Sequence, residues 1–194
     1  MGIDPGLAHT GWGVIEQCGP HLACVAYGCV ATPASRPLAE RLMKIHHQIG
    51  AVVERFRPEC VGIETVWFGQ NVTAAFATGQ ARGAALVACA EGGLAVGEYT
   101  PRQIKLAVVG EGSAEKDQVQ YMVRHLLSLD RSPEPDHAAD ALAAVFMLVR
   151  DINTAISAGA GKQALKAFAE VFDELTGVLG LVYNRKTETL DSEI

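Results

Sequence analysis

The sequence is short of long apolar runs and of paired cysteines. No apolar run approaches the roughly 18 residues that a membrane-spanning helix needs, and no charged-then-apolar signal segment opens the chain. The five cysteines include no Cys-x-x-Cys pair, which is typical of reduced thiols. These shortages argue against a membrane protein and against a disulfide-stapled secreted domain, and we expect a cytoplasmic location.

Net positive charge is also missing. The formal charge of −6 is unlike that of a protein that coats nucleic acid without selectivity. Any contact with DNA is therefore expected to be a local basic patch, helped by bound cations. With 194 residues, 49% of them hydrophobic, the chain suits one globular domain with an appendage.

The N-terminal stretch 1–15 is typical of two strands joined by a tight turn. Pro5-Gly6 supplies the turn, and Gly11 and Gly13 interrupt the second strand as they do where a strand passes close to other backbone. The turn leaves the carboxylate of Asp4 at the end of the first strand. Because Asp-Pro-Gly is also a common structural turn, Asp4 needs partners elsewhere before it indicates a site.

Hydrophobic periodicity predicts an α/β fold in which a meander of three strands is followed by right-handed crossovers. Further carboxylates lie where elements end or begin: Glu64 closes a short apolar strand, and the segment 136–140 (Asp-His-Ala-Ala-Asp) opens an Ala-rich helix. Strands are expected near 2–4, 10–15, 22–31, 59–65 and 94–99, and helices near 37–56, 72–90, 102–108, 114–129 (capped by Ser113) and from 136 onward.

The segment 136–140 can present metal ligands on one helix face. His137 and Asp140 lie three residues apart and Asp136 and Asp140 four apart, so either pair can point the same way. Asp136 also has a structural alternative, since an acid at a helix N-terminus stabilises the helix dipole. Several oxygen ligands around two divalent cations would suit phosphodiester hydrolysis.

Six motifs occur in one order that resembles the RuvC family, the bacterial Holliday junction resolvases of the RNase H-like superfamily. They are Gly-Ile-Asp-Pro-Gly (2–6), Ile-Glu (63–64), Gly-Gln-Ala-Arg-Gly (79–83), Arg-Gln-Ile-Lys (102–105), Val-Gly-Glu-Gly-Ser-Ala-Glu-Lys (109–116) and His-Ala-Ala-Asp-Ala-Leu (137–142). The resemblance implies an RNase H-like mixed five-stranded sheet flanked by helices, with a C-terminal helical extension.

The resemblance also implies the metal-binding catalytic set. It assigns this role to Asp4, Glu64, His137 and Asp140, with two Mg²⁺ per subunit and Mn²⁺ able to substitute. It selects His137 over Asp136, because the family's third ligand lies three residues before the last. Many members have Asp there and some have His, and an imidazole suits Mn²⁺ better than Mg²⁺.

The DNA-binding residues implied by the resemblance are Arg102, Lys105, Lys116 and Trp67. Lys116 is expected in the first turn of a helix, where backbone amides already attract phosphate. Trp67 could stack on an unpaired base, or it and Phe68 could be ordinary core aromatics. The lysines likewise have the alternative of being solvated surface residues. Arg82 is expected to be structural or to lie at an interface.

The implied activity is that of a structure-selective endonuclease. A homodimer would nick two opposed strands of a four-way DNA junction at symmetric positions, working with a branch-migration motor complex and no membrane. Two alternatives remain from the residues alone: a catalytically impaired protein that binds junctions, or a fragment of an actin-like ATPase or sugar kinase. The second shares the acidic residue and Gly-rich turn but needs two lobes.

Two features depart from the family pattern. Met1 stands three residues before Asp4, where the family has several apolar residues, so either the true start lies upstream or the first strand is shortened. The tail, from about 141 to 194, resembles the helical region that follows the catalytic domain of cysteinyl-tRNA synthetase. We expect a nuclease domain over 1–149 and a helical extension over 150–194, arising from a genuine fusion or an assembly error. Its helices are expected through Ile156 and over 161–180, as a passive cap rather than an RNA-binding module.

Overall fold

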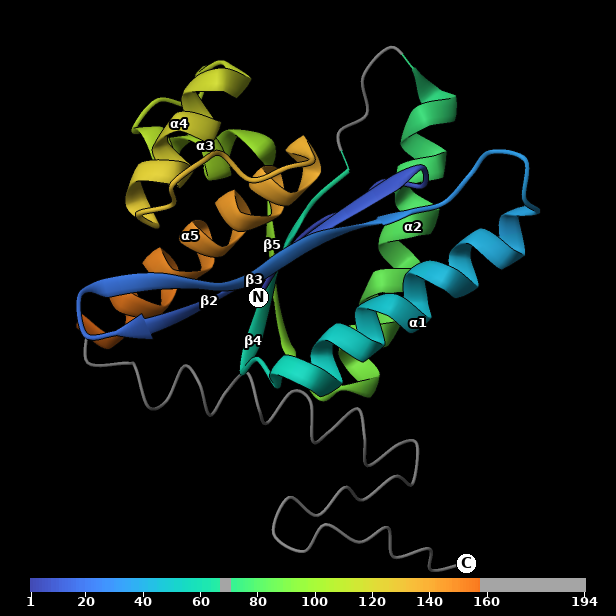
Figure 1. Ribbon diagram of the computed structural model, residues 1–194, viewed down its shortest axis with the longest axis horizontal. Helices are drawn as coiled ribbons and strands as arrows, with labels where there is room; N and C mark the ends of the chain where they lie inside the picture. Colours follow the sequence, from blue (N-terminus) through green and yellow to red (C-terminus); the bar gives the residue numbers. More distant parts are fainter. Residues whose placement is uncertain (67–70, 158–194) are drawn as a thin grey trace, which may run out of the picture. The chain divides into compact units, whose positions relative to one another are not determined.

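A five-stranded sheet with the strand order β3-β2-β1-β4-β5 forms the centre of the computed structural model, which describes residues 1–66 and 71–157 (Figure 1). The short strand β1 is central: it runs antiparallel to β2 and parallel to β4. This arrangement confirms the expected mixed sheet. The strands are β1 (Gly2–Asp4), β2 (His9–Cys18), β3 (His21–Ala31), β4 (Cys60–Glu64) and β5 (Ala95–Tyr99).

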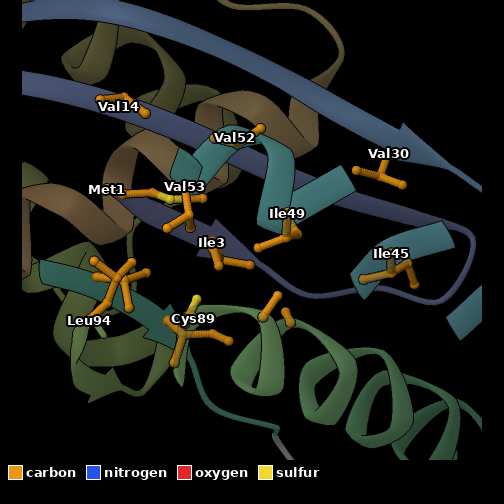
Figure 2. Close-up of a cluster of buried hydrophobic side chains, with 14 of the residues drawn as sticks. Met1, Ile3, Val14, Val30, Ile45, Ile49, Val52, Val53, Cys89 and Leu94 are labelled. Carbon is orange, nitrogen blue, oxygen red and sulfur yellow. The ribbon is translucent and has the colours of Figure 1, made fainter. Parts of the chain in front are cut away.

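Helices cover both faces of the sheet. On one face α1 and α2 pack over a core that includes Ile3, Val14 and Ile63 (Figure 2). On the other face α5 lies against the strands, and α3 and α4 cover the outer side of α5 (Figure 1). The helices are α1 (Leu38–Phe56), α2 (Val72–Glu91), α3 (Pro101–Val109), α4 (Lys116–Leu126) and α5 (Asp136–Ser157). No helix in the described ranges is long and apolar enough to cross a membrane.

Glycines occupy adjacent strand positions on the face of the sheet that α5 covers. Gly2 pairs with Gly13 on β2 and with Gly62 on β4, and the neighbouring rung pairs Asp4 with Gly11. A Cβ added to Gly2 would lie 2.1 Å from the carbonyl oxygen of Ala141, and one added to Gly11 would lie 1.8 Å from that of His137. At Gly2 and Gly11 the α5 backbone therefore lies directly on the strands, whereas at Gly13 the Leu142 side chain takes the space of the missing Cβ.

Small residues on α5 complete this contact. The helix is buried between the sheet and the α3–α4 pair at positions 138, 139, 141–146 and 148. Alanine fills five of these nine positions, which matches the glycines on the strands below. This close approach brings the first turn of α5 to the end of β1.

The fourth helix differs from the sequence prediction at both ends. It begins at Lys116 with Glu115 as its N-cap, and the Gln118 side chain accepts a hydrogen bond from the Glu115 amide at 2.8 Å. The expected cap Ser113 instead donates its hydroxyl to Glu111, so the prediction that Ser113 begins the helix is wrong. The helix stops at Leu126 rather than at residue 129, because Ser128 adopts a left-handed φ of 50°.

Helix α5 continues past the domain boundary expected at residues 149 and 150. Burial and the nearby Asp151 raise the pKa of Tyr99 on β5, and Gln17 on β2 donates to Asn153 at 3.2 Å. The compact unit that contains the sheet extends over residues 1–154. The helix expected over 161–180 lies outside the described residues.

The contact between β2 and α5 predicts an asymmetry between two glycines. We expect Gly11→Ala to destabilise the protein by about 1–3 kcal/mol, because the new methyl group overlaps backbone that cannot rotate away. Gly50→Ala on α1 is the matched control: its Cβ meets nothing within 4 Å, and alanine is the better helix former. Urea denaturation of both variants measures the difference, and equal stabilities would contradict the close packing described here.

Candidate active site

Asp4 ends the central strand and points to the α5 side of the sheet. Its side chain is 17% exposed. The turn that follows is anchored twice: the buried Thr10 hydroxyl donates to the Gly6 carbonyl at 2.8 Å, and the Thr32 amide donates to the Ala8 carbonyl at 2.8 Å. Asp4 therefore projects from backbone that is fixed on both sides.

Glu64 occupies the equivalent end of the neighbouring parallel strand. Gly2 pairs with Gly62 and Ile3 with Ile63, so Asp4 and Glu64 come next in register and share the α5 face. Burial, together with the charges of Asp4 and Asp140, raises the pKa of Glu64 to about 8. An opposing effect of Lys105 and Lys116 is too small to cancel it. In the absence of a cation, full ionisation of these carboxylates at neutral pH therefore costs free energy.

The first turn of α5 supplies two more groups. The Nδ1 atom of His137 lies 2.8 Å from the Oδ2 atom of Asp4, and this hydrogen bond raises the pKa of His137. Burial raises the pKa of Asp140, followed by the charge of Asp4. Ligand atoms from Asp4, His137 and Asp140 lie within 4.8 Å of one another. The structure thus brings together groups that are more than 130 residues apart in the sequence.

Asp136 points elsewhere. It is exposed, and its carboxylate lies 3.3 Å from the ammonium group of Lys116. Lys116 also lies 3.2 Å from Asp140, so one ammonium group serves both carboxylates. Burial lowers the pKa of Lys116, but the two acids outweigh it and the net shift is upward. His137 rather than Asp136 therefore belongs to the group of converging donors, and its assignment as a metal ligand stays a prediction.

The other candidate DNA-binding residues have different surroundings. Lys105 on α3 lies near enough to Glu64 to influence its pKa. Arg102 is exposed in the first turn of α3, where its side-chain stem lies against Gly112. Trp67 lies outside the described residues. Arg82 pairs with Glu98 on β5, in keeping with the structural role expected for it.

An open cleft of about 700 Å³ begins at the acidic group. Asp4, Glu64 and His137 line one end of it, and the start of α2 lines the other. Asn71, the N-cap of α2, contributes there and accepts a hydrogen bond from the Ala74 amide at 3.0 Å. Substrate can therefore reach the acidic group from solvent.

The donor set fits divalent cations. Two carboxylates and an imidazole converge within bonding reach of a common centre, and Glu64 adds a third carboxylate beside them. Carboxylate oxygens are the ligands that Mg²⁺ prefers, and imidazole extends the range to Mn²⁺. A cation would also oppose the effects of burial and of the neighbouring carboxylate charges, which raise the pKa values of Glu64 and Asp140.

One residue at the site was missed by the sequence reasoning. The imidazole of His9, at the start of β2, stacks on that of His137 with ring centroids 5.4 Å apart. Strand alternation carries the signal: His9 lies two residues before Gly11, so it shares the face on which Gly11 meets α5.

Comparison with known proteins places this geometry in a family. Residues 1–147 match the model of "Crossover junction endodeoxyribonuclease RuvC". The chain is 48% identical over 146 residues to the crossover junction endodeoxyribonuclease RuvC of Treponema denticola, which covers 75% of this chain and 82% of that protein. The chain belongs to the RuvC family.

Solved structures agree with the assignment. Thermus thermophilus RuvC is 41% identical, with a TM-score of 0.69 over 75% of this chain and 90% of its own. The same protein in complex with a Holliday junction substrate gives a TM-score of 0.71, covering 75% of this chain and 89% of its own. The RNase H-like fold expected from the motifs is thereby confirmed, and the family match decides against an actin-like ATPase or sugar kinase.

The tail carries a second match. Residues 138–183 match the model of the DALR domain, over the part of the chain for which the sequence indicates a resemblance to cysteinyl-tRNA synthetase. The two family models overlap on α5 at residues 138–147. The division into domains at residues 149 and 150 stays a prediction.

The carboxylate group predicts an unusual pH dependence of stability. Glu64 and Asp140 are acids with raised pKa values and His137 is a base with a raised pKa, so the folded state holds protons that the unfolded state releases. Metal-free protein is therefore expected to lose stability as the pH rises from about 5 toward 8, by up to about 1.4 kcal/mol per pH unit for each proton involved.

Urea denaturation in EDTA at several pH values measures this slope. Glu64→Gln should flatten it, because the amide neither ionises nor is repelled by Asp4. Glu59→Gln, an exposed acid just before the same strand, is the control and should leave the slope unchanged. A slope that is identical in both variants would show that Glu64 ionises normally.

Proposed function

We propose that this chain is a structure-selective endonuclease that resolves four-way DNA junctions in homologous recombination and DNA repair. The observation that carries the proposal is the convergence of Asp4, His137 and Asp140 within 4.8 Å, beside Glu64, in a chain of the RuvC family. We expect the protein to act on DNA in the cytoplasm, together with a branch-migration motor complex.

The proposed cofactor is Mg²⁺, two per subunit, with Mn²⁺ able to substitute. Asp4, Glu64, His137 and Asp140 would hold the ions. Bound metal would lower the pKa of the attacking water and stabilise the leaving 3′-oxygen. The residues themselves orient this chemistry: Asp4 fixes one ring nitrogen of His137 through the 2.8 Å hydrogen bond, and the anchored turn after β1 fixes Asp4.

Lysines beside the acidic group support the proposed binding of DNA. Lys116 stands at the N-terminus of α4, where the helix amides add positive potential, and Lys105 contributes from α3. We propose that both meet the DNA backbone near the cut, with Arg102 and Trp67 as further DNA-binding residues. The protein has a net charge of −6, so this local pair of cations carries the attraction that the surface as a whole does not provide.

An apolar stripe on α2 supports the proposed homodimer. Val72, Phe76 and Val87 are 57%, 66% and 52% exposed along one side of the helix. Between them lie Gly79 and Gly83, where an added Cβ would meet nothing within 4 Å. A second copy of the same stripe could approach closely over these glycines and bury the flanking side chains, which would pair two active centres on one junction.

The stripe predicts a change in mass. Phe76→Glu is expected to convert a dimer to a monomer in sedimentation or light-scattering measurements, because it places a charge in the apolar contact. Paired nicking of a junction should fall with it. Val25→Glu on β3, where the parent residue is 49% exposed, is the matched control and should remain a dimer. A Phe76→Glu variant of unchanged mass would rule out this face as the dimer contact.

The central test of the proposed function is nicking of a synthetic four-way junction in Mg²⁺ or Mn²⁺, with linear duplex as control substrate. Asp4→Asn should lower cleavage by about a hundredfold or more, the scale on which single groups that stabilise a transition state contribute. Junction binding should survive, because the shape hardly changes. Asp130→Asn, an exposed acid outside the acidic group, should cleave normally. Wild-type protein that binds junctions but never cuts them would instead favour the catalytically impaired alternative.

A further inference from the structure

His9 is a polar residue at the site to which the proposed roles give no task. It is exposed at the first position of β2 and its ring stacks on that of His137, with centroids 5.4 Å apart and an interplanar angle of 11°. This separation and tilt fall within the range of offset-stacked aromatic pairs. The His137 ring is therefore held across one face by His9 and at one nitrogen by Asp4.

The backbone that carries His9 is anchored on both sides. The preceding residue, Ala8, accepts a hydrogen bond from the Thr32 amide at 2.8 Å. The following residue, Thr10, is fully buried and donates its hydroxyl to Gly6 at 2.8 Å. The same strand carries Gly11, which lies against the His137 backbone. One contact between β2 and α5 therefore fixes the positions of both the His9 and the His137 rings.

His9 contacts a ligand candidate and lies outside the group of converging donors. Over the described residues, the donor atoms within 4.8 Å of one another come from Asp4, His137 and Asp140. The His137 side chain is 39% exposed, so a ring held at one nitrogen alone could pivot about that hydrogen bond. A second ring against its face removes this freedom.

We propose that His9 is a positioning residue for His137, which keeps the imidazole in the orientation in which Nδ1 meets Asp4. The inference rests on the proposed metal-dependent nuclease function. An alternative follows from a shallow cleft that His9 lines together with Glu134, Asp136 and His137, from which it could contact DNA directly. The two roles differ in what a substitution changes: metal affinity and cleavage rate in the first case, junction affinity in the second.

The test uses His9→Ala and His9→Phe in the full chain, with His21→Ala as control because His21 is an exposed histidine at the start of β3. Mn²⁺ affinity without DNA, junction affinity in EDTA and single-turnover cleavage of prebound junction are measured for each. His9→Ala should lower Mn²⁺ affinity and cleavage by about threefold to tenfold, the range that one aromatic pair is worth, and leave junction affinity unchanged. His9→Phe, which keeps a flat ring, should regain most of the loss.

A double-mutant cycle separates positioning from a general structural role. In a His137→Asp background there is no ring to stack on, so His9→Ala should have no further effect on Mn²⁺ affinity. An equal loss in both backgrounds would overturn the inference, as would a loss confined to junction affinity or a His9→Ala variant identical to the wild type. If the wild type cuts no junction, the proposed function fails, but Mn²⁺ affinity still decides the role of His9.

Discussion

The site depends on glycines in the central strands beneath α5. Gly2, Gly11, Gly13 and Gly62 carry no Cβ on this face, and the α5 backbone fills the space at Gly2 and Gly11, while the Leu142 side chain fills it at Gly13. Interiors are packed too densely for such a contact to tolerate even a methyl group without a shift. Because α5 lies this close to the sheet, His137 and Asp140 reach the end of β1. The same close approach brings the ring of His137 against that of His9.

The close approach of α5 to the sheet brings like charges together, which lowers the stability of the folded protein. Three carboxylates share a partly buried site, and Lys116 compensates only part of their charge because it also pairs with Asp136. Such a site is unfavourable when empty and favourable when cations fill it, which links folding to metal binding. Packing elsewhere offsets this loss of stability, because the core under α1 and α2 and the buried part of α5 are apolar.

Local signals in the sequence were enough for the order of elements. Periodicity located the five strands and the main helices, and the Asp-Pro-Gly turn, Ile63-Glu64 and the segment 136–140 indicated candidate carboxylates. The resemblance to the RuvC family, rather than spacing, joined them into one set and selected His137 over Asp136. The start of α4 was mistaken because a hydroxyl at Ser113 can cap a helix or satisfy a loop, and its partner Glu111 decides which. The stacking of His9 on His137 joins residues more than a hundred positions apart, so strand alternation gives the face of His9 but not its partner. The ammonium group of Lys116, which Asp136 and Asp140 share, joins residues about twenty positions apart, which no local pattern encodes.

The length of α5 has a consequence for whatever the C-terminal segment does. The helix carries His137 in its first turn and continues unbroken to Ser157, and its contacts with β2 and β5 extend to Asn153. With a rise of 1.5 Å per residue, Thr154 lies about 20 Å along the axis from Asp140. The helix thus places about four turns between the acidic group in its first turn and residue 154, where the compact unit that contains the sheet ends. The chain therefore leaves this unit about 20 Å along α5 from Asp140, and not beside the acidic group.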